Sequence, residues 1–227
     1  MNKLKKTLIR MAVAVGMMCG VLSGRAATYT DRDDHVWTYT TDATSATVTG
    51  VDPARGVLTI PSELGGKPVV GFGKTFSEKQ DVTRVTIPAG VTAIADQAFL
   101  NCKNLKGVTI NATAMTSIGY QAFKGCYNME KFAIPNSVTT LGKGVFSGCS
   151  ALEEVTIGDG VVSLTGVDFT TGGIGSNALN YNESFGSDGA LNGMFCNCTS
   201  LKTVNWGTGL KTIGNIAFLG CSALEKV

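Results

Sequence analysis

Apolar and polar positions follow a pattern that repeats along most of the chain. Each repeat carries one phenylalanine inside a similar short block, as in QAFLNC, QAFKGC, GVFSGC, GMFCNC and IAFLGC. These phenylalanines recur at nearly constant spacing, with one longer interval before the sixth, and are Phe76, Phe99, Phe123, Phe146, Phe169, Phe195 and Phe218. A period of about 23 residues is typical of solenoids, in which each unit is one small supersecondary element stacked on its neighbour. We therefore predict a repeat solenoid.

The order of apolar residues within a unit predicts two short strands. A cysteine follows the phenylalanine by three residues, a leucine or methionine comes three residues later, and then V-x-I, as in CKNLKGVTI at 102–110. The spacing of two in V-x-I places both side chains on one face of a strand. A turn with proline or glycine follows, then a second short alternation such as VTAI, and then a helical turn down to the next cysteine.

A single unit cannot bury its own phenylalanine, leucine and isoleucine. Stacking places equivalent residues of successive units one strand spacing apart, roughly 4.8 Å, so that they form continuous ladders. The recurring block is therefore interpreted as core. We expect a mainly β, right-handed solenoid of short parallel strands with short helical turns.

The unit resembles the bacterial leucine-rich repeat of the BspA-like (Treponema) type, approximately C-x-x-L-x-x-[VI]-x-[IL]-P-x-x-[VL]-x-x-I-x-x-x-A-F. The segment CYNMEKFAIPNSVTTLGKGVF at 126–146 matches it nearly throughout, and the resemblance covers about residues 58–227. It departs at Lys79, which replaces a cysteine, and around Phe169, where the motif is incomplete. The resemblance implies an extracellular or surface location and a role in adhesion or protein recognition. It implies no catalytic residues.

The two ends of the chain do not follow the repeat. Residues 1–26 have the organisation of a secretory signal peptide, with basic residues, the apolar run MAVAVGMMCGVL and small residues up to Ala26. Residues 27–57 predict an N-terminal β-hairpin cap around the turn DATS, with Trp37 and Tyr39 laid over the first coil. Residues 58–227 are assigned to the solenoid. The chain stops at LEKV within a predicted strand and without a polar capping unit, which predicts that Val227 ends a fragment.

One long segment interrupts the repeat. Residues 170–193 are rich in glycine, asparagine and serine and replace the expected coil. Rigid repeat scaffolds tolerate long insertions at little entropic cost, and binding is often varied there. We therefore take Tyr181 and Phe185 as the candidate binding residues. The alternative is a tolerated insertion without a binding role.

The charge of the chain changes once the leader is set aside. The leader carries five of the 19 basic residues and none of the 17 acidic ones, which leaves a mature chain with 14 basic residues and a net charge of −3. No basic stripe that could track phosphates remains, so nucleic acid is not an expected partner. No second apolar run approaches the roughly 20 residues of a membrane span.

The sequence does not indicate an enzyme, a cofactor or a metal site. The chain has a single histidine, His35, which is interpreted as a surface strand residue and leaves no pair for a zinc motif. GIGSNA at 173–178 matches a dinucleotide fingerprint only formally, because no strand precedes it and no helix follows it. Glu183 and Asp188 lack the spacing of a calcium loop.

The six cysteines of the mature chain lack the spacing of a zinc site. Five of them, Cys102, Cys126, Cys149, Cys198 and Cys221, recur once per unit and are interpreted as small buried ladder residues. Export permits the alternative of disulfides between neighbouring units. Cys196 lies outside this series and is the candidate for pairing.

The middle residue of each V-x-I strand should point away from the stack, as for Thr86, Thr109, Ala133, Thr156 and Asn205. This face is small and polar, and we expect it to be solvated. We predict an exported, secreted or surface-located, non-enzymatic recognition or adhesion scaffold that binds an extracellular protein or glycan. The alternative is a structural spacer that presents a further C-terminal domain.

Overall fold

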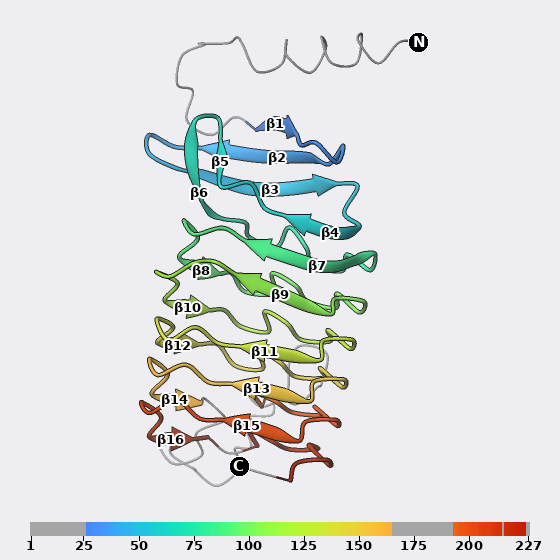
Figure 1. Ribbon diagram of the computed structural model, residues 1–227, viewed down its shortest axis with the longest axis vertical. Coiled ribbons are helices and arrows are strands. Elements are labelled where there is room, and N and C mark those ends of the chain that lie inside the picture. The colour runs from blue at the N-terminus through green and yellow to red at the C-terminus, as the bar shows by residue number, and fades with distance from the viewer. Residues whose placement is uncertain (1–25, 165–192, 215, 226–227) are drawn as a thin grey trace, which may run out of the picture.

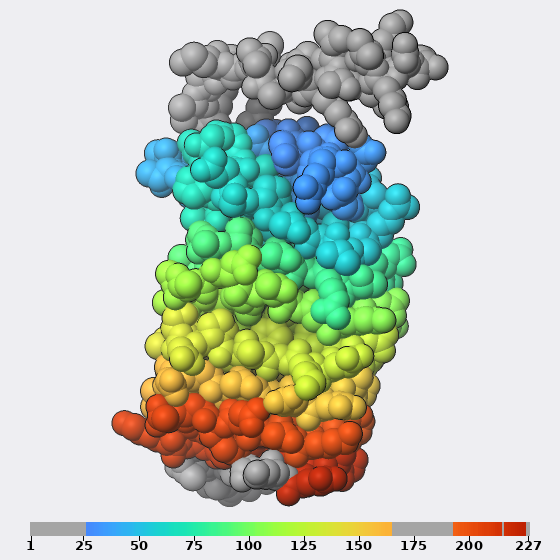
Figure 2. Space-filling view, viewed as in Figure 1, coloured from blue at the N-terminus to red at the C-terminus, as the bar shows by residue number. Residues whose placement is uncertain are grey.

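The computed structural model describes residues 26–164, 193–214 and 216–225. Successive coils of the chain lie one below another, from the N-terminal cap at one end to the last coil at the other (Figure 1). The space-filling view shows the same order as horizontal bands of colour along the stack (Figure 2). The predicted solenoid of short parallel strands is therefore confirmed.

The longer strands form a ladder on one side of the solenoid. β4 (Gly56–Thr59), β7 (Val82–Ile87) and β9 (Gly107–Ile110) make one parallel sheet. β11 (Lys131–Ala133), β13 (Glu154–Thr156) and β15 (Thr203–Asn205) make a second one, which continues the first along the stack (Figure 1). Each V-x-I motif begins in one of these strands and ends in it or directly after it.

Two-residue strands form a second ladder. β8 (Ala93–Ile94), β10 (Ser117–Ile118) and β12 (Thr140–Leu141) pair in parallel, as do β14 (Ser163–Leu164) and β16 (Thr212–Ile213). These strands come from the second alternation of each unit. Their register places equivalent residues side by side, for example Ile94 beside Ile118.

The segment expected to form a helical turn forms no helix in the part of the chain that is described. Around Phe99, the N–H groups of Gln97, Phe99 and Asn101 donate instead to main-chain oxygens of the next coil. Gln97 and Asn101 also have positive φ angles, 57° and 56°. Left-handed residues on both sides of the phenylalanine stop a right-handed helix from propagating. The block QAFLNC thus builds a third side of the coil, bonded to its neighbour.

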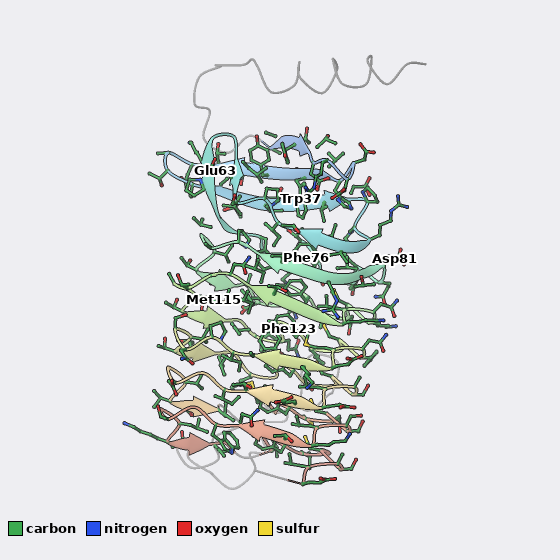
Figure 3. All side chains as sticks on the ribbon, in the orientation of Figure 1. Trp37, Glu63, Phe76, Asp81, Met115 and Phe123 are labelled. Atoms are coloured by element: carbon green, nitrogen blue, oxygen red, sulfur yellow. The ribbon has the colours of Figure 1, made fainter. Side chains whose placement is uncertain are left out.

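The phenylalanines stack face to face along the axis. Ring centroids are 5.1 Å apart for Phe76 and Phe99, 5.0 Å for Phe99 and Phe123, and 5.5 Å for Phe123 and Phe146, with nearly parallel planes. Figure 3 shows Phe76 and Phe123 inside the stack. The interpretation of the recurring block as core is confirmed, since these rings are fully buried.

The stack corrects one expectation about the repeats. The ring beside Phe146 is that of Phe195, at 5.4 Å, so Phe169 is not the next member of the ladder. Strand pairing leads to the same conclusion. Glu154 pairs with Lys131 on one side and with Thr203 on the other, and Thr203 is more than twice as many residues away from Glu154 in the sequence as Lys131 is. The ladder therefore continues without a break across an insertion between Leu164 and Gly193.

The N-terminal cap is a five-stranded sheet. β2 (Val36–Thr41) and β3 (Ala46–Asp52) form the predicted hairpin, and β1 (Ala27–Thr30) adds an antiparallel strand that the sequence analysis did not anticipate. β6 (Lys67–Gly71) pairs in parallel with β3, and β5 (Glu63–Leu64) pairs with β6 across the Gly65-Gly66 turn.

The cap covers the first coil through its aromatic residues, as predicted. The ring of Trp37 meets Phe76 edge-on, with centroids 6.4 Å apart. Figure 3 shows Trp37 at the cap end of the core, next to Phe76. Trp37 is fully buried and Tyr39 nearly so, and the cap therefore closes the apolar end of the stack.

Candidate binding site at the N-terminal cap

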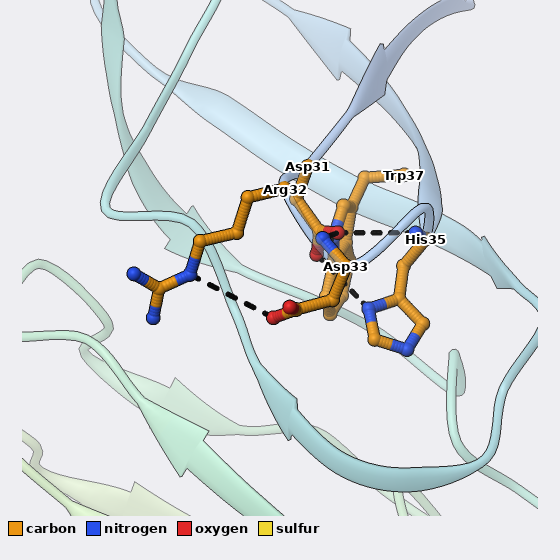
Figure 4. A network of polar contacts seen from close by, with 5 residues as sticks. All are labelled: Asp31, Arg32, Asp33, His35 and Trp37. Carbon is orange, nitrogen blue, oxygen red and sulfur yellow. Dashed lines mark hydrogen bonds and ion pairs between the residues drawn. The ribbon is translucent and has the colours of Figure 1, made fainter. Parts of the chain in front are cut away.

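The loop between β1 and β2 is organised around one carboxylate, that of Asp31 (Figure 4). Its Oδ1 accepts the main-chain N–H groups of Asp33 and His35, at 2.9 and 3.0 Å. Its Oδ2 accepts the indole N–H of Trp37 at 2.9 Å and lies 3.1 Å from Nδ1 of His35. An ionised carboxylate only accepts hydrogen bonds, so Nδ1 of His35 is the donor in this contact.

These contacts keep Asp31 ionised. Partial burial raises the pKa of this carboxyl, but the hydrogen bonds from Trp37, His35 and Asp33 outweigh it and hold the pKa below its usual value. Charge-assisted hydrogen bonds of this kind are roughly twice as strong as neutral ones. Asp31 therefore ties the β1–β2 loop to the core tryptophan.

His35 does not lie on the surface as expected. It is only 9% exposed, because residues 35, 37 and 39 alternate toward the interior of the cap sheet. The alternation of residues in HVWTY places His35 on the same face as Trp37 and Tyr39. The surface position was expected because histidine is polar.

A pocket of about 270 Å³ opens between this loop and β4. The residues that line it are Tyr29, Asp31, Arg32, Asp33, His35, Val57, Thr59 and Pro61. Tyr29 and Val57 expose 45% and 62% of their surface. No local sequence pattern indicates this site, because its residues come from β1, the β1–β2 loop and the region of β4, which only the fold brings together.

The carboxylates and the histidine of the pocket also have a geometry that a metal ion could use. Ligand atoms of Asp31, Asp33 and His35 lie within 4.8 Å of one another. Both oxygens of Asp31 are already occupied by N–H donors, and Arg32 lies 3.7 Å from the carboxylate of Asp33. A metal ion would have to displace these donors, so the cluster is better explained as a structural turn.

The predicted binding residues Tyr181 and Phe185 lie outside the described residues, as do GIGSNA at 173–178, Glu183 and Asp188. The structure does place the two ends from which their segment leaves the stack. Leu164 ends β14 and is fully buried, and Gly193 is also buried directly before Met194 and Phe195. Both ends are thus held by the core.

The outward face of the longer strands has the predicted small and polar character. Thr86 lies beside Thr109, and Thr156 lies between Ala133 and Asn205. Glu154 accepts hydrogen bonds from Lys131 at 2.8 Å and from Asn205 at 2.9 Å. These contacts lower the pKa of Glu154, first through the Lys131 hydrogen bond. Lys131 and Glu154 on this face are therefore paired between neighbouring strands.

The cysteine ladder is part of the core. Each ladder thiol donates to the main-chain oxygen of a phenylalanine one coil earlier, as from Cys102 to Phe76 at 2.7 Å and from Cys149 to Phe123 at 3.1 Å. Burial raises the pKa of Cys102 to about 12. Cys196 is a buried free thiol, and the structure places no disulfide on any of the six cysteines it describes.

Within the same described residues, no helix has the length and apolar character needed to cross a membrane. A search of curated protein sequences finds no significant match.

Solved structures with the same fold are bacterial leucine-rich repeat proteins. A leucine rich cell surface protein from Faecalibacterium prausnitzii is 28% identical, with a TM-score of 0.63 over 88% of this chain. The match covers 53% of that protein, so this chain spans about half its length. The T. pallidum Leucine Rich Repeat protein is 20% identical, with a TM-score of 0.56 over 88% of each chain, and supports the fold alone.

The repeat itself identifies the family. The family model of the BspA type leucine rich repeat region matches residues 73–185 and 190–227, in six copies. These ranges contain most of the phenylalanine stack, the cysteine ladder and most of the paired strands described above. The resemblance of the unit to this repeat is confirmed, and the chain belongs to the BspA-type leucine-rich repeat family.

Proposed function

We propose that this protein is an exported recognition scaffold that binds an extracellular protein or glycan at the cell surface, without catalysis. Family membership supports a scaffold for interactions. The similarity to a leucine rich cell surface protein supports a surface location.

The start of the fold supports export. β1 begins at Ala27, directly after the cleavage site that the sequence predicts. Removal of residues 1–26 would therefore leave every strand of the cap sheet complete.

The observation that carries the proposal is an insertion within an unbroken stack. Phe146 and Phe195 stack as closely as rings of consecutive repeats, although an additional segment separates them in the sequence. Because Leu164 and Gly193 are held in the core, the insertion can vary in sequence without a cost to the ladder. We place the contacts with the partner in this insertion, with Tyr181 and Phe185 as aromatic anchors.

The test is binding of the mature chain, residues 27–227, to extracellular-matrix proteins, host-cell surfaces and polysaccharides. It is run beside a variant in which residues 172–192 are replaced by a short Gly-Ser linker. A second variant, with Tyr181→Ser and Phe185→Ser, keeps the length of the insertion. Tyr127→Ala removes an aromatic residue of the solenoid that is 44% exposed and serves as the matched control.

We expect saturable binding that both insertion variants lose and that Tyr127→Ala retains. Circular dichroism establishes that each variant is folded. If no form binds and all are folded, the insertion is not a recognition site and the alternative of a structural spacer is favoured.

A further inference from the structure

We propose that the pocket between the β1–β2 loop and β4 binds one unit of a neutral saccharide. The proposal deepens the recognition function above and rests on it, but it places a contact at the cap, far along the solenoid from β14, where the insertion begins (Figure 1). The relevant residues are Tyr29, Arg32, Asp33, Val57 and Thr59.

One wall of the pocket is apolar and the other is polar. Tyr29 and Val57 give it an aromatic ring and an exposed aliphatic side chain, from β1 and β4 respectively. Tyr29 pairs directly with Trp37 across the two strands, so its backbone position is set by the core of the cap. Aromatic and aliphatic surfaces of this kind contact the C–H faces of a sugar ring.

The polar wall offers donors and acceptors together. The side chains of Arg32 and Asp33 are 92% and 67% exposed, and their contact of 3.7 Å is too long for a hydrogen bond. Thr59 adds an exposed hydroxyl. A sugar hydroxyl both donates and accepts, and can therefore bind the Asp33 carboxylate and the Arg32 guanidinium at once.

The charges favour a neutral ligand. Arg32 and Asp33 present opposite charges side by side, so an isolated cation or anion would meet repulsion from one of them. The remaining carboxylate, that of Asp31, is occupied by Trp37 and His35. A neutral ligand with many hydroxyls can form hydrogen bonds with both Arg32 and Asp33.

The size of the pocket sets the size of the ligand. Pockets for drug-sized molecules are roughly 300 to 1,000 Å³. The volume of about 270 Å³ lies just below this range and suits a single sugar unit at the end or within a glycan.

The two tryptophans of the chain make the test specific. Trp37 donates its indole N–H to Asp31 beneath the pocket, whereas Trp206 packs against Phe218 in the last coil. In ¹⁵N-labelled mature chain, the two indole N–H signals report on the two ends of the solenoid. The probes are the methyl glycosides of glucose, galactose, mannose and N-acetylglucosamine at millimolar concentration.

We expect at least one glycoside to shift the Trp37 signal saturably and to leave Trp206 unchanged. Tyr29→Ala should weaken this binding about tenfold, by loss of one aromatic contact. Asp33→Ala should weaken it as well, whereas Tyr127→Ala should not. Tyr29, Asp33 and Tyr127 are exposed, so their side chains can be removed without opening a cavity in the core.

Two outcomes overturn the proposal: no glycoside shifts Trp37, or both tryptophans shift together. In the first case, Nα-acetyl-lysine methylamide is titrated as a further probe and shifts Trp37 if the pocket takes a different ligand. Such a shift would indicate a protein side chain as the ligand. The same titration on the variant without the insertion separates the two proposals. Glycoside binding that persists there, without surface binding by any form, supports the pocket and contradicts the role of the insertion.

Discussion

The thiol of Cys126 donates a hydrogen bond to the main-chain oxygen of Phe99, one coil earlier, across 3.2 Å. The same oxygen accepts the N–H of Cys102 within its own coil. A cysteine at this position is thus small enough for the stack and also joins two coils. The repeated cysteine is explained by this double role, without a disulfide or a metal.

We predict that Cys126→Ala lowers the free energy of unfolding by about 1–3 kcal/mol, because it removes both the thiol hydrogen bond and buried volume. Urea unfolding followed by circular dichroism measures the loss. Thr113→Ala, at an exposed position, is the control and should change stability by less than about 0.5 kcal/mol. Equal stability of the two variants would show that the thiol ladder does not stabilise the stack.

We predict that stability falls as the pH rises from about 9 to about 12, in part through Cys102. Burial raises the pKa of this thiol from 9.0 to about 12, so in this window the folded state keeps a proton that the unfolded state has lost. The stabilisation is complete below pH 9 and disappears as the pH approaches 12. The difference is at most about 1.4 kcal/mol per pH unit for one thiol.

The measurement for this thiol is urea unfolding at several pH values for the native chain and for Cys102→Ala. The variant should have the shallower alkaline slope. The same slope in both proteins would mean that Cys102 ionises equally in the folded and unfolded states.

We predict that Gly125→Ala is more destabilising than Gly66→Ala. Both glycines have a φ of 73°, so an alanine at either position is strained by about 1–2 kcal/mol. A Cβ atom at Gly125 would also clash with Oδ1 of Asn101, whereas a Cβ atom at Gly66 would meet nothing within 4 Å beyond its chain neighbours. The difference in stability between the two variants therefore measures the effect of the clash.

Thermal unfolding of both variants, and of Gly125→Ala combined with Asn101→Gly, tests this explanation. Asn101→Gly removes the clashing side chain and should recover the additional loss. If it recovers nothing, the clash is not the cause.

We predict that Asp31→Ala destabilises the cap by about 1–3 kcal/mol, and Asp31→Asn by less, because asparagine keeps one acceptor oxygen. The pKa of Asp31 is lowered in the folded state, so its contribution is present above the usual value of 3.8 and is lost as the pH falls below it. The variants should therefore approach the native chain in stability in acid. Fluorescence of Trp37, in a chain in which Trp206→Phe removes the second tryptophan, is followed during urea unfolding at pH 7 and at low pH and measures both effects. A gap that stays constant across these pH values would contradict the role of the charge.

The sequence by itself determined the repeat and its core. The period of about 23 residues, the alternation in V-x-I and the recurring phenylalanine and cysteine identify which residues stack, because a regular solenoid places equivalent residues in equivalent contacts. The family, the outward threonine face and the Trp37 contact with the first coil follow from the same local pattern.

Only the tertiary structure decided what depends on contacts between distant segments. Phe195 takes the place beside Phe146 that the spacing assigned to Phe169, since the stack selects the ring that continues its hydrogen-bonded register. The predicted helical turn is absent from the described coils because the N–H groups around Phe99 bond to the next coil, which a single unit does not contain. The pocket between Tyr29 and Val57 exists for the same reason, as it joins two strands whose proximity no local pattern encodes.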